Sequence, residues 1–346
     1  MRALVLTAYN ELRVQELPEP EVGRSDVLVR VEVCGICGSD VHGMDGSTGR
    51  RRPPLVMGHE AAGIIVRVGS DVMAHRVGDR VTFDSTIYNP NSFFSRRGQI
   101  NLCDDRRVFG VSCEEYRQQG AFAELVAVPQ HILYNLPESM TFQQAALVEP
   151  VSIAVHARRL TPIEDGDSVV VVGAGLIGLT MIQVLKNTRA KEIIAVDLDE
   201  ARLSLARELG ATVAFNPMVV ADLTTAIRAV TQGRGADVAF EAVGIGATVR
   251  AALAGVRKGG AVTLIGNLSA EVALPLQALV TREIRLQGSC ASSGEYPECL
   301  DLIASGKIDV ERVISAEAPL EEGPAWFDRL YRKEPGLMKV LLRPNG

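Results

Sequence analysis

Short apolar runs broken by glycine and proline characterise the chain up to about Val128. They cover residues 3–6, 27–33, 63–68, 80–83 and 123–128. Runs of this length, separated by turn-forming residues, are typical of strands. The sequence therefore predicts an all-β or β-rich unit here, in the form of a partly open barrel.

From about Ser168 the pattern changes, and apolar strands alternate with helices. Strands are predicted at 168–173, 192–197, 211–215, 237–241 and 261–266, and helices at 176–186, 200–209, 219–230 and 247–256. This alternation is typical of a parallel sheet covered on both faces, which is an α/β fold. A strand at 283–288, a helix at 296–305 and a strand at 338–342 follow. The pattern does not decide whether this last segment completes the second unit or returns to the first.

Length and composition narrow the class of protein. At 346 residues the chain exceeds what one hydrophobic core usually supports, so two domains are expected. Hydrophobic residues make up 47% and charged residues 23%, as in globular enzymes. The net charge of -6 argues against a nucleic-acid partner. The basic runs Arg50-Arg51-Arg52 and Arg96-Arg97 are interpreted as solvated loop faces.

The chain shows neither a targeting segment nor a membrane-spanning pattern. The amino terminus lacks the apolar region and cleavage site of a secretory signal. The longest apolar stretch, 169–185, contains three glycines and is too short to span a bilayer. Six cysteines are too few for a disulfide scaffold in a chain of this length. We therefore expect a cytoplasmic protein without a membrane partner.

A glycine-rich turn lies where the first strand of the α/β region meets its first helix. The pattern G-x-G-x-x-G consists of Gly173, Gly175 and Gly178, with Leu176 and Ile177 between the last two. The glycines allow a tight turn, close approach of a pyrophosphate and close helix–strand packing, while the helix N-terminus attracts negative charge. The alternative is a tight connection that binds no ligand.

The next predicted strand supplies the residue that makes this turn a dinucleotide signature. Asp197 follows Gly178 by 19 residues, where a carboxylate can accept hydrogen bonds from both ribose hydroxyls of NAD. Leu198 follows it, so no adjacent arginine is offered to the 2′-phosphate of NADP. We therefore favour NAD. Arg202 is a candidate for the adenine edge, or an ordinary surface arginine.

A second set of residues has the chemistry of a metal site. It consists of Cys37, the pair His59-Glu60 after Gly58, and Glu149 before Pro150. A thiolate, an imidazole and carboxylates suit a borderline-soft divalent ion, and so few protein donors leave a position for substrate oxygen. Each residue alone has an ordinary explanation as a packing residue. Together with the dinucleotide signature they predict metal-assisted hydride transfer.

These residues resemble the zinc-dependent medium-chain dehydrogenase/reductases, in the sorbitol (polyol) dehydrogenase-like branch. The resemblance covers nearly the whole chain. Its motifs are Cys34-Gly35-Ile36-Cys37-Gly38-Ser39-Asp40-Val41-His42, Gly58-His59-Glu60, Gly78-Asp79-Arg80-Val81, Gly120-Ala121-Phe122-Ala123-Glu124, Glu149-Pro150, the glycine turn and Gly306-Lys307-Ile308. The motifs are specific for the family and less specific for the substrate.

The resemblance implies a fold and a ligand set. It implies a GroES-like β-rich catalytic domain from residues 1–150 and 290–346, with a Rossmann NAD-binding domain at 151–289 between them. In relatives the positions of Cys37 and His59 ligate a catalytic zinc, and those of Glu60 and Glu149 supply the remaining donors directly or through water. The resemblance thus gives Glu60 two roles, as a ligand and as a catalytic residue.

One departure from the family concerns a second zinc. Many relatives hold a structural zinc with four cysteines, spaced C-x-x-C-x-x-C followed by another cysteine. Counting back from Cys103, those positions are Asn89, Ser92 and Ser95. We therefore expect one metal ion per subunit, with Cys103 and Cys113 as ordinary loop thiols.

The expected chemistry is hydride transfer from a secondary alcohol to NAD, with the metal lowering the pKa of the alcohol. Ser39 can hydrogen-bond the substrate oxygen, and His42 can accept the proton. This spacing matches the proton relay of relatives, so the catalytic roles are carried over. The alternatives are an N-cap serine before a short helix starting near Asp40, and an exposed loop histidine.

The resemblance implies a polyol or sugar substrate, because relatives with Cys, His and Glu donors commonly oxidise secondary alcohols of that kind. The polyol-recognising arginine and aromatic residue of the animal sorbitol enzymes have no counterpart in 288–293, a small and uncharged segment. L-Threonine 3-dehydrogenase and 2,3-butanediol dehydrogenase therefore remain alternatives. A further alternative is a crystallin-like structural protein or NAD sensor that retains the fold without turnover. The resemblance also implies a homodimer or homotetramer.

Overall fold

The computed structural model describes residues 1–112 and 117–346, so Cys113 lies outside the described residues. Its contacts divide the chain into two compact units. The first unit comprises Met1–Glu149, Ser293–Ser305 and Val310–Gly346, and the second comprises Pro150–Ser292 and Gly306–Asp309. The predicted class, a β-rich unit plus an α/β unit, is confirmed.

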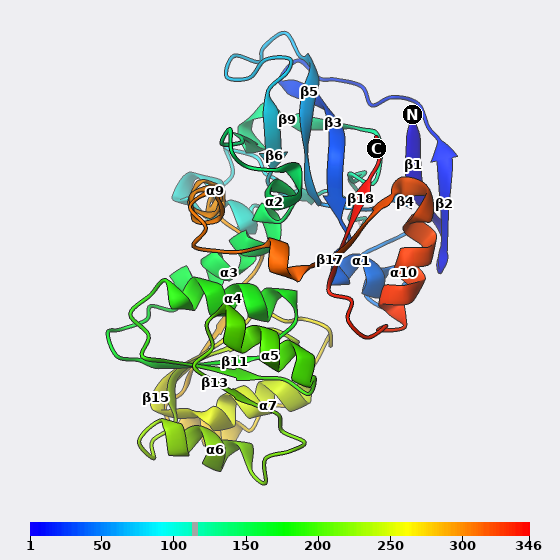
Figure 1. Cartoon of the computed structure of the whole chain (residues 1–346). Helices are drawn as coiled ribbons and strands as arrows, with labels where there is room; N and C mark the ends of the chain where they lie inside the picture. The colour runs from blue at the N-terminus through cyan, green and yellow to red at the C-terminus, as the bar shows by residue number, and fades with distance from the viewer. Residues whose placement is uncertain (113–116) are drawn as a thin grey trace. The chain divides into compact units, whose positions relative to one another are not determined.

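The first unit is built around a mixed sheet in the order β10-β6-β5-β3-β18-β17, with β9 also paired to β3 (Figure 1). Its strands are β3 (Asp26–Gly35), β5 (Glu60–Val68), β6 (Arg80–Phe83), β9 (Leu125–Pro129), β10 (Leu133–Asn135), β17 (Ile314–Pro319) and β18 (Lys339–Arg343). A smaller sheet in the order β2-β1-β4 contains β1 (Arg2–Ala8), β2 (Glu11–Glu16) and β4 (Leu55–Val56). A third pair consists of β7 (Thr86–Ile87) and β8 (Arg107–Val108).

The carboxyl-terminal strand belongs to this first unit. β18 runs antiparallel to β3, with Leu341 opposite Gly35 and Leu342 opposite Cys34. Both leucines are fully buried, and Leu342 belongs to the hydrophobic core of the unit. The segment whose place the apolar pattern left open therefore returns to the first sheet.

Helices complete the first unit. They are α1 (Gly38–Gly43), α2 (Phe142–Ala146), α9 (Tyr296–Ala304) and α10 (Gly323–Tyr331), while α3 (Val148–Leu160) begins in this unit and continues into the second. Phe327 of α10 meets Phe122 edge-to-face, with 5.8 Å between ring centroids. This contact ties the carboxyl-terminal helix to the core because both rings are fully buried.

The second unit is a parallel six-stranded sheet in the order β13-β12-β11-β14-β15-β16. The strands are β11 (Ser168–Val172), β12 (Glu192–Val196), β13 (Val213–Phe215), β14 (Ala236–Glu241), β15 (Val256–Leu264) and β16 (Arg285–Gly288). The chain order reverses beside β11, since β12 lies on one side of it and β14 on the other. Such a switch point, at the carboxyl ends of the strands, is where doubly wound sheets bind ligands.

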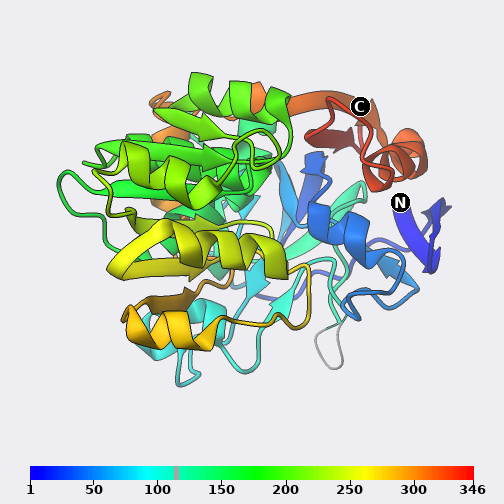
Figure 2. The ribbon, with the colours of Figure 1, turned by 90° about the horizontal axis from the view of Figure 1, so that it is seen from below.

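Helices cover both faces of this sheet. They are α4 (Leu176–Lys186), α5 (Glu200–Leu209), α6 (Leu223–Val230), α7 (Gly246–Gly255) and the short α8 (Leu276–Thr281). Figure 1 shows α4 and α5 on one face, and α6 and α7 on the other. Figure 2 looks onto the face covered by α7, drawn in yellow. Among the described residues, no helix is both long enough and apolar enough to cross a bilayer.

The predicted elements match the second unit closely. α4 and α5 have the predicted bounds, but α6 begins at Leu223 and not at Val219. The reason is a cap: the Asp222 side chain accepts a hydrogen bond from the Thr225 amide at 2.6 Å, which starts the helix there. In the first unit β2, β17 and α10 are additional to the prediction. β2 has few apolar positions, and the alternation in β17 is carried mainly by small alanines, so both strands give a weak apolar signal.

Candidate active site

Cys37 lies at the N-terminus of α1, directly after β3. Its Sγ accepts hydrogen bonds from the Ser39 amide at 3.4 Å and the Ser39 hydroxyl at 3.2 Å. The Asp40 carboxylate in turn accepts from the Cys37 amide at 3.4 Å. Cys37 is therefore the N-cap of the helix, and the alternative in which Ser39 has this role is wrong.

His59 and Glu60 follow a sharp turn at Gly58, and Glu60 begins β5. Gly58 has a φ of +92°, and a Cβ there would lie 2.9 Å from Cys34 Sγ and Phe122. Gly35 is paired with Glu60 across β3 and β5, and a Cβ on Gly35 would lie 2.3 Å from Glu60 Oε2. The two glycines thus leave the space that the buried His59 and Glu60 side chains require.

The structure brings Cys37, His59 and Glu60 together. One ligand atom of each lies within 4.8 Å of the other two. His59 Nδ1 and Glu60 Oε1 are buried, and no hydrogen-bond donor or acceptor among the described residues pairs with them. Buried polar atoms normally have partners. This donor set, with a sulfur atom, an imidazole and an unpaired Glu60 oxygen, fits a zinc ion.

The protein environment keeps Cys37 protonated until a cation arrives. Burial raises the pKa of the Cys37 thiol to about 11, and Glu60 adds to the effect. Lys339 and the Ser39 hydrogen bond oppose it. Because a metal binds the thiolate, loading the site must release this proton, and metal affinity must rise with pH.

Glu149 lies in the first turn of α3 and is also buried. It is not one of the three clustered ligands, but its Oε1 accepts a hydrogen bond from the Ser85 hydroxyl at 3.2 Å. Burial raises the pKa of Glu149 to about 8, His59 opposes the rise, and Glu60 and Cys37 add to it. Glu149 therefore shares the electrostatic environment of the cluster. Ser85 carries no motif that would identify it from the sequence.

Lys339, the first residue of β18, is a site residue that the sequence analysis missed. Its ammonium is fully buried, donates to Glu60 Oε2 at 2.5 Å and donates to the Ile36 carbonyl at 2.9 Å. Burial alone would lower its pKa, but Glu60 and Cys37 outweigh this effect and raise the pKa. Lys339 thus balances the negative charge of Glu60 from a position some 280 residues away in the sequence.

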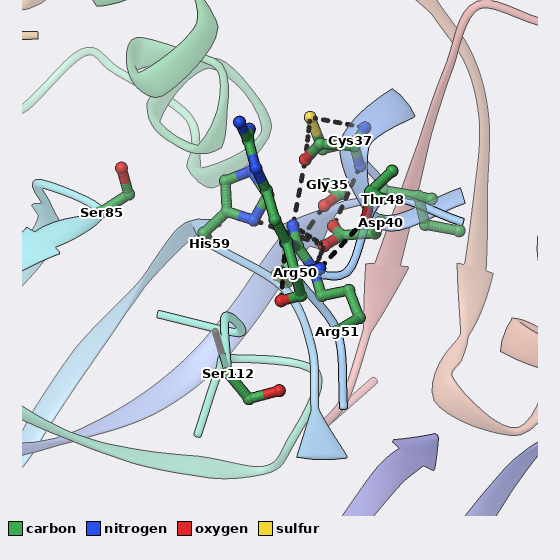
Figure 3. Close-up of polar contacts among 12 residues, drawn as sticks. Gly35, Cys37, Asp40, Thr48, Arg50, Arg51, His59, Ser85 and Ser112 are labelled. Atoms are coloured by element: carbon green, nitrogen blue, oxygen red, sulfur yellow. Dashed lines mark hydrogen bonds and ion pairs between the residues drawn. The ribbon is translucent and has the colours of Figure 1, made fainter. Parts of the chain in front are cut away.

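Arg51 corrects the interpretation of the basic run 50–52 as a solvated face. Arg50 and Arg52 are exposed, but Arg51 is only 3% exposed. Its guanidinium donates to Asp40 Oδ1 from Nε at 3.2 Å and from Nη2 at 2.9 Å (Figure 3). Asp40 is fully buried, and its Oδ1 lies 3.6 Å from His59 Nδ1. The three arginines of the run are therefore not equivalent, because an arginine is buried only where a partner such as Asp40 balances its charge.

Ser39 and His42 both lie in α1, three positions apart, and so share one face of the helix. The Ser39 hydroxyl contacts Cys37 Sγ, and it also accepts a hydrogen bond from Arg51 Nη2 at 3.1 Å. His42 is half-buried in the helix, so it is not an exposed loop residue. Burial and the nearby Lys333 lower its pKa, against the opposing charge of Asp45.

The glycine turn lies at the carboxyl end of β11, in the second unit. Gly173 has a φ of +95°, and a Cβ on Gly178 would lie 1.7 Å from the Gly173 carbonyl oxygen. Gly175 is the N-cap of α4, which begins with Leu176 and Ile177. The helix N-terminus is therefore free of a side-chain cap and can face an anion.

Asp197 follows β12 and is tied to this turn. Its Oδ2 accepts from the Ala174 amide at 2.6 Å, and its Oδ1 accepts from the Asp199 amide at 2.9 Å. Asp199 caps α5, and Arg202 lies 3.8 Å from it as an ion pair. The structure thus brings Asp197 to the glycine turn, while Arg202 is engaged with its own helix terminus.

Cys103 differs from an ordinary loop thiol because it is buried and hydrogen-bonded. Cys103 is buried, its Sγ accepts from the Asn89 amide at 3.3 Å, and the hydroxyls of Ser92 and Ser95 are 2.9 Å apart. Burial opposes ionisation, but hydrogen bonds, with Ser92 contributing most, lower the pKa of Cys103. The three residues at the positions of the missing cysteines therefore surround the remaining one.

Comparison with known proteins gives matches to both units. Residues 23–138 match the alcohol dehydrogenase GroES-like domain, and residues 177–305 match the zinc-binding dehydrogenase family. The chain is 32% identical to sorbitol dehydrogenase from Bacillus subtilis (strain 168), over 100% of this chain and 98% of the relative.

Solved structures resemble the chain over almost its whole length. 2R,3R-butanediol dehydrogenase from Bacillus subtilis superposes with a TM-score of 0.89 and 30% identity, covering 99% of each chain. A protein from Sinorhizobium meliloti 1021, described as a zinc-binding dehydrogenase and solved with NADP bound, superposes with a TM-score of 0.90 and 31% identity, again covering 99% of each.

Proposed function

The chain belongs to the zinc-dependent medium-chain dehydrogenases, in the polyol dehydrogenase branch, and from this premise we propose that it oxidises a secondary alcohol of a polyol or sugar-type substrate with NAD. Membership makes it an enzyme that uses zinc and a nicotinamide cofactor, which removes the alternative of a structural protein or NAD sensor. The observation that carries the proposal is the convergence of Cys37, His59 and Glu60 on one point.

We assign the catalytic role to the first unit and cofactor binding to the second, with domains at 1–150 plus 290–346 and at 151–289. Cys37, His59, Glu60 and Glu149 would hold the zinc ion. When bound, zinc supplies Lewis acidity that eases deprotonation of an alcohol, and the nicotinamide ring supplies the hydride acceptor. Which glutamate is a direct ligand depends on Lys339, because its ammonium already occupies one oxygen of Glu60.

The remaining chemistry is the removal of the hydroxyl proton. In the proposal the Ser39 hydroxyl accepts this proton and passes its own toward His42. The lowered pKa of His42 keeps its imidazole neutral at neutral pH, so a ring nitrogen has a lone pair for the proton. The shared helix face of the two residues supports this role as well.

The experiment that tests the proposal is NADH formation from a panel of polyols, sugar acids and amino alcohols. We expect turnover with at least one vicinal diol and loss of that turnover in Cys37→Ser. A zinc-loaded, folded protein that reduces no NAD or NADP with any member of the panel would contradict the proposal.

A second candidate substrate is 2,3-butanediol, with L-threonine as a further alternative. The similarity to 2R,3R-butanediol dehydrogenase over 99% of the chain favours the diol, and the small, uncharged segment 288–293 offers no charged group for a longer polyol. Parallel kcat/KM measurements on sorbitol, xylitol, 2,3-butanediol and L-threonine distinguish these readings. The highest value identifies the class.

NAD is preferred over NADP in our proposal because Asp197 lies at the glycine turn. Its carboxylate would repel a 2′-phosphate and accept ribose hydroxyls. One relative was solved with NADP and another, from E. coli CFT073, with NADH, so the preference rests on Asp197 alone. Comparing kcat/KM for NAD and NADP in the wild type decides it.

One zinc ion per subunit and a homo-oligomer complete the proposal. Asn89, Ser92 and Ser95 around Cys103 provide no thiolate for a structural zinc, so metal analysis should give one equivalent.

β16 ends the second sheet with all four residues exposed, and Leu276 and Val280 of α8 are 68% and 63% exposed. An exposed strand edge beside apolar residues supports pairing of two copies, in a cytoplasmic dimer or tetramer. Light scattering of the wild type and Leu286→Lys tests this.

A further inference from the structure

We propose that Arg51 is a positioning residue that fixes the Ser39 hydroxyl and, through Asp40, the His59 imidazole, so that one buried guanidinium couples the proton relay to a metal ligand. The proposal rests on the proposed function, because it assigns Arg51 a part in that same site. It concerns a residue that neither the motifs nor the ligand set identify.

The placement of Arg51 is determined by packing as well as charge. Its side chain crosses Gly43, where a Cβ would lie 2.5 Å from Arg51 Cγ. The guanidinium then reaches two different groups with Nη2 alone: Asp40 Oδ1 at 2.9 Å and Ser39 Oγ at 3.1 Å. The two hydrogens of this nitrogen have fixed directions in the plane of the guanidinium. Arg51 therefore sets the position of Ser39 relative to Asp40.

The bond to Ser39 leaves the hydroxyl ready for proton transfer. A serine oxygen has one proton to donate and two lone pairs to accept with. Arg51 takes one lone pair and the hydroxyl proton is donated to Cys37 Sγ, so the second lone pair can accept the proton of a substrate hydroxyl. Without Arg51 the hydroxyl would be held only by its hydrogen bond to Cys37 Sγ at 3.2 Å, and its oxygen would no longer have a fixed direction.

The bond to Asp40 extends the influence of Arg51 to the expected ligands. One carboxylate oxygen of Asp40 accepts from the Cys37 amide, and the other lies 3.6 Å from His59 Nδ1 (Figure 3). The negative charge of Asp40 beside Nδ1 favours the ring orientation and tautomer that leave the other ring nitrogen for the metal. Since Arg51 donates twice to the oxygen that faces His59, it determines where that oxygen lies.

The test compares Arg51→Lys with Arg52→Met, an exposed arginine of the same run. Lysine retains the positive charge opposite Asp40 but has a single nitrogen and no planar fork, so it does not bridge Asp40 and Ser39. We expect kcat to fall about 10- to 100-fold with KM changed far less, because a positioning contact is lost and no substrate contact is. Arg52→Met should match the wild type.

Two further readouts separate positioning from general destabilisation. In the cobalt-substituted protein, Arg51→Lys should shift the visible ligand-field bands, because the His59 orientation changes. In a double-mutant cycle, Ser39→Ala should lower kcat much less in the Arg51→Lys background than in the wild type. Should Arg51→Lys not fold, Arg51→Gln provides a neutral variant of similar shape, and added guanidinium ion should partly restore its kcat.

The outcomes distinguish this proposal from the proposed function. Suppose that the wild type is active, that Arg51→Lys has the same kcat and cobalt spectrum, and that the effects of Arg51→Lys and Ser39→Ala are additive. This result would overturn the role of Arg51 and leave the proposed function intact. A wild type that oxidises no alcohol would overturn the proposed function. In that case the cobalt spectrum would still test whether Arg51 positions His59, because the spectrum is recorded without substrate. An Arg51→Lys spectrum identical to that of the wild type would then overturn the positioning of His59 as well.

Discussion

The glycine turn and the cluster around Cys37 differ in how much of the chain builds them. The turn, its helix and Asp197 come from one continuous stretch of strand, helix and strand. The three clustered ligands lie between β3 and α1 and at the start of β5, and the buried groups that interact with them come from α3 and β18. The glycine turn contains few charged side chains, and its shape is determined by backbone geometry. The cluster around Cys37 contains buried carboxylates and a thiol, and therefore needs buried cations to balance them.

The largest expected effect tests whether the two sites can be disabled separately. Cys37→Ser should lower kcat about 10³-fold or more, since a Lewis acid contributes several kcal/mol to the barrier. Bound zinc should fall in metal analysis, while the affinity for NADH, followed by fluorescence, stays within about twofold of the wild type. A parallel loss of NADH binding would mean that the sites are not independent.

The next effect concerns the charge balance of the cluster. Lys339→Met leaves Glu60 buried without its cation, and removal of one partner of a buried ion pair costs about 3–5 kcal/mol. We expect chemical denaturation of the metal-free protein to show a loss of this size. The exposed Lys258→Met is the matched control. Adding Glu60→Gln should recover part of the loss, and a failure to recover any would argue against the ion pair as its cause.

The contrast also explains what could be predicted from the sequence. The bounds of α4 and α5 could be predicted because capping and apolar period are local signals. Cys37, His59 and Glu60 stand in recognisable motifs. Lys339 and Arg51 could not be predicted, because a lysine or arginine in the sequence has no sign of burial until the fold places Glu60 or Asp40 beside it.

A smaller effect should appear in the pH dependence of stability. The pKa of Glu149 is raised to about 8, mainly by burial, so the folded protein holds this proton more tightly than the unfolded chain. This tighter proton binding contributes to the free energy of unfolding. The contribution is fully present below pH 4.5, the ordinary pKa, and is lost as the pH rises through about 8. The Tm of the metal-free protein should therefore decline across this window.

Glu149→Gln should reduce that decline, because the amide has no proton to lose. The exposed Glu138→Gln is the control and should leave the slope unchanged. If Glu149→Gln and the wild type have the same slope from pH 5 to 8, burial of Glu149 is not what drives it.

The smallest effect returns to the glycine turn. Asp197→Ala removes the carboxylate that accepts from the Ala174 amide, and with it the repulsion of a 2′-phosphate. We expect the ratio of kcat/KM for NAD over NADP to fall about tenfold, which corresponds to about 1.4 kcal/mol, while bound zinc is unchanged. Asp199→Asn is a matched control, because asparagine retains the N-cap of α5 and removes a nearby negative charge. A similar fall in both variants would assign cofactor preference to the local charge of the region. A fall in Asp197→Ala alone would assign it to the one carboxylate that reaches the turn.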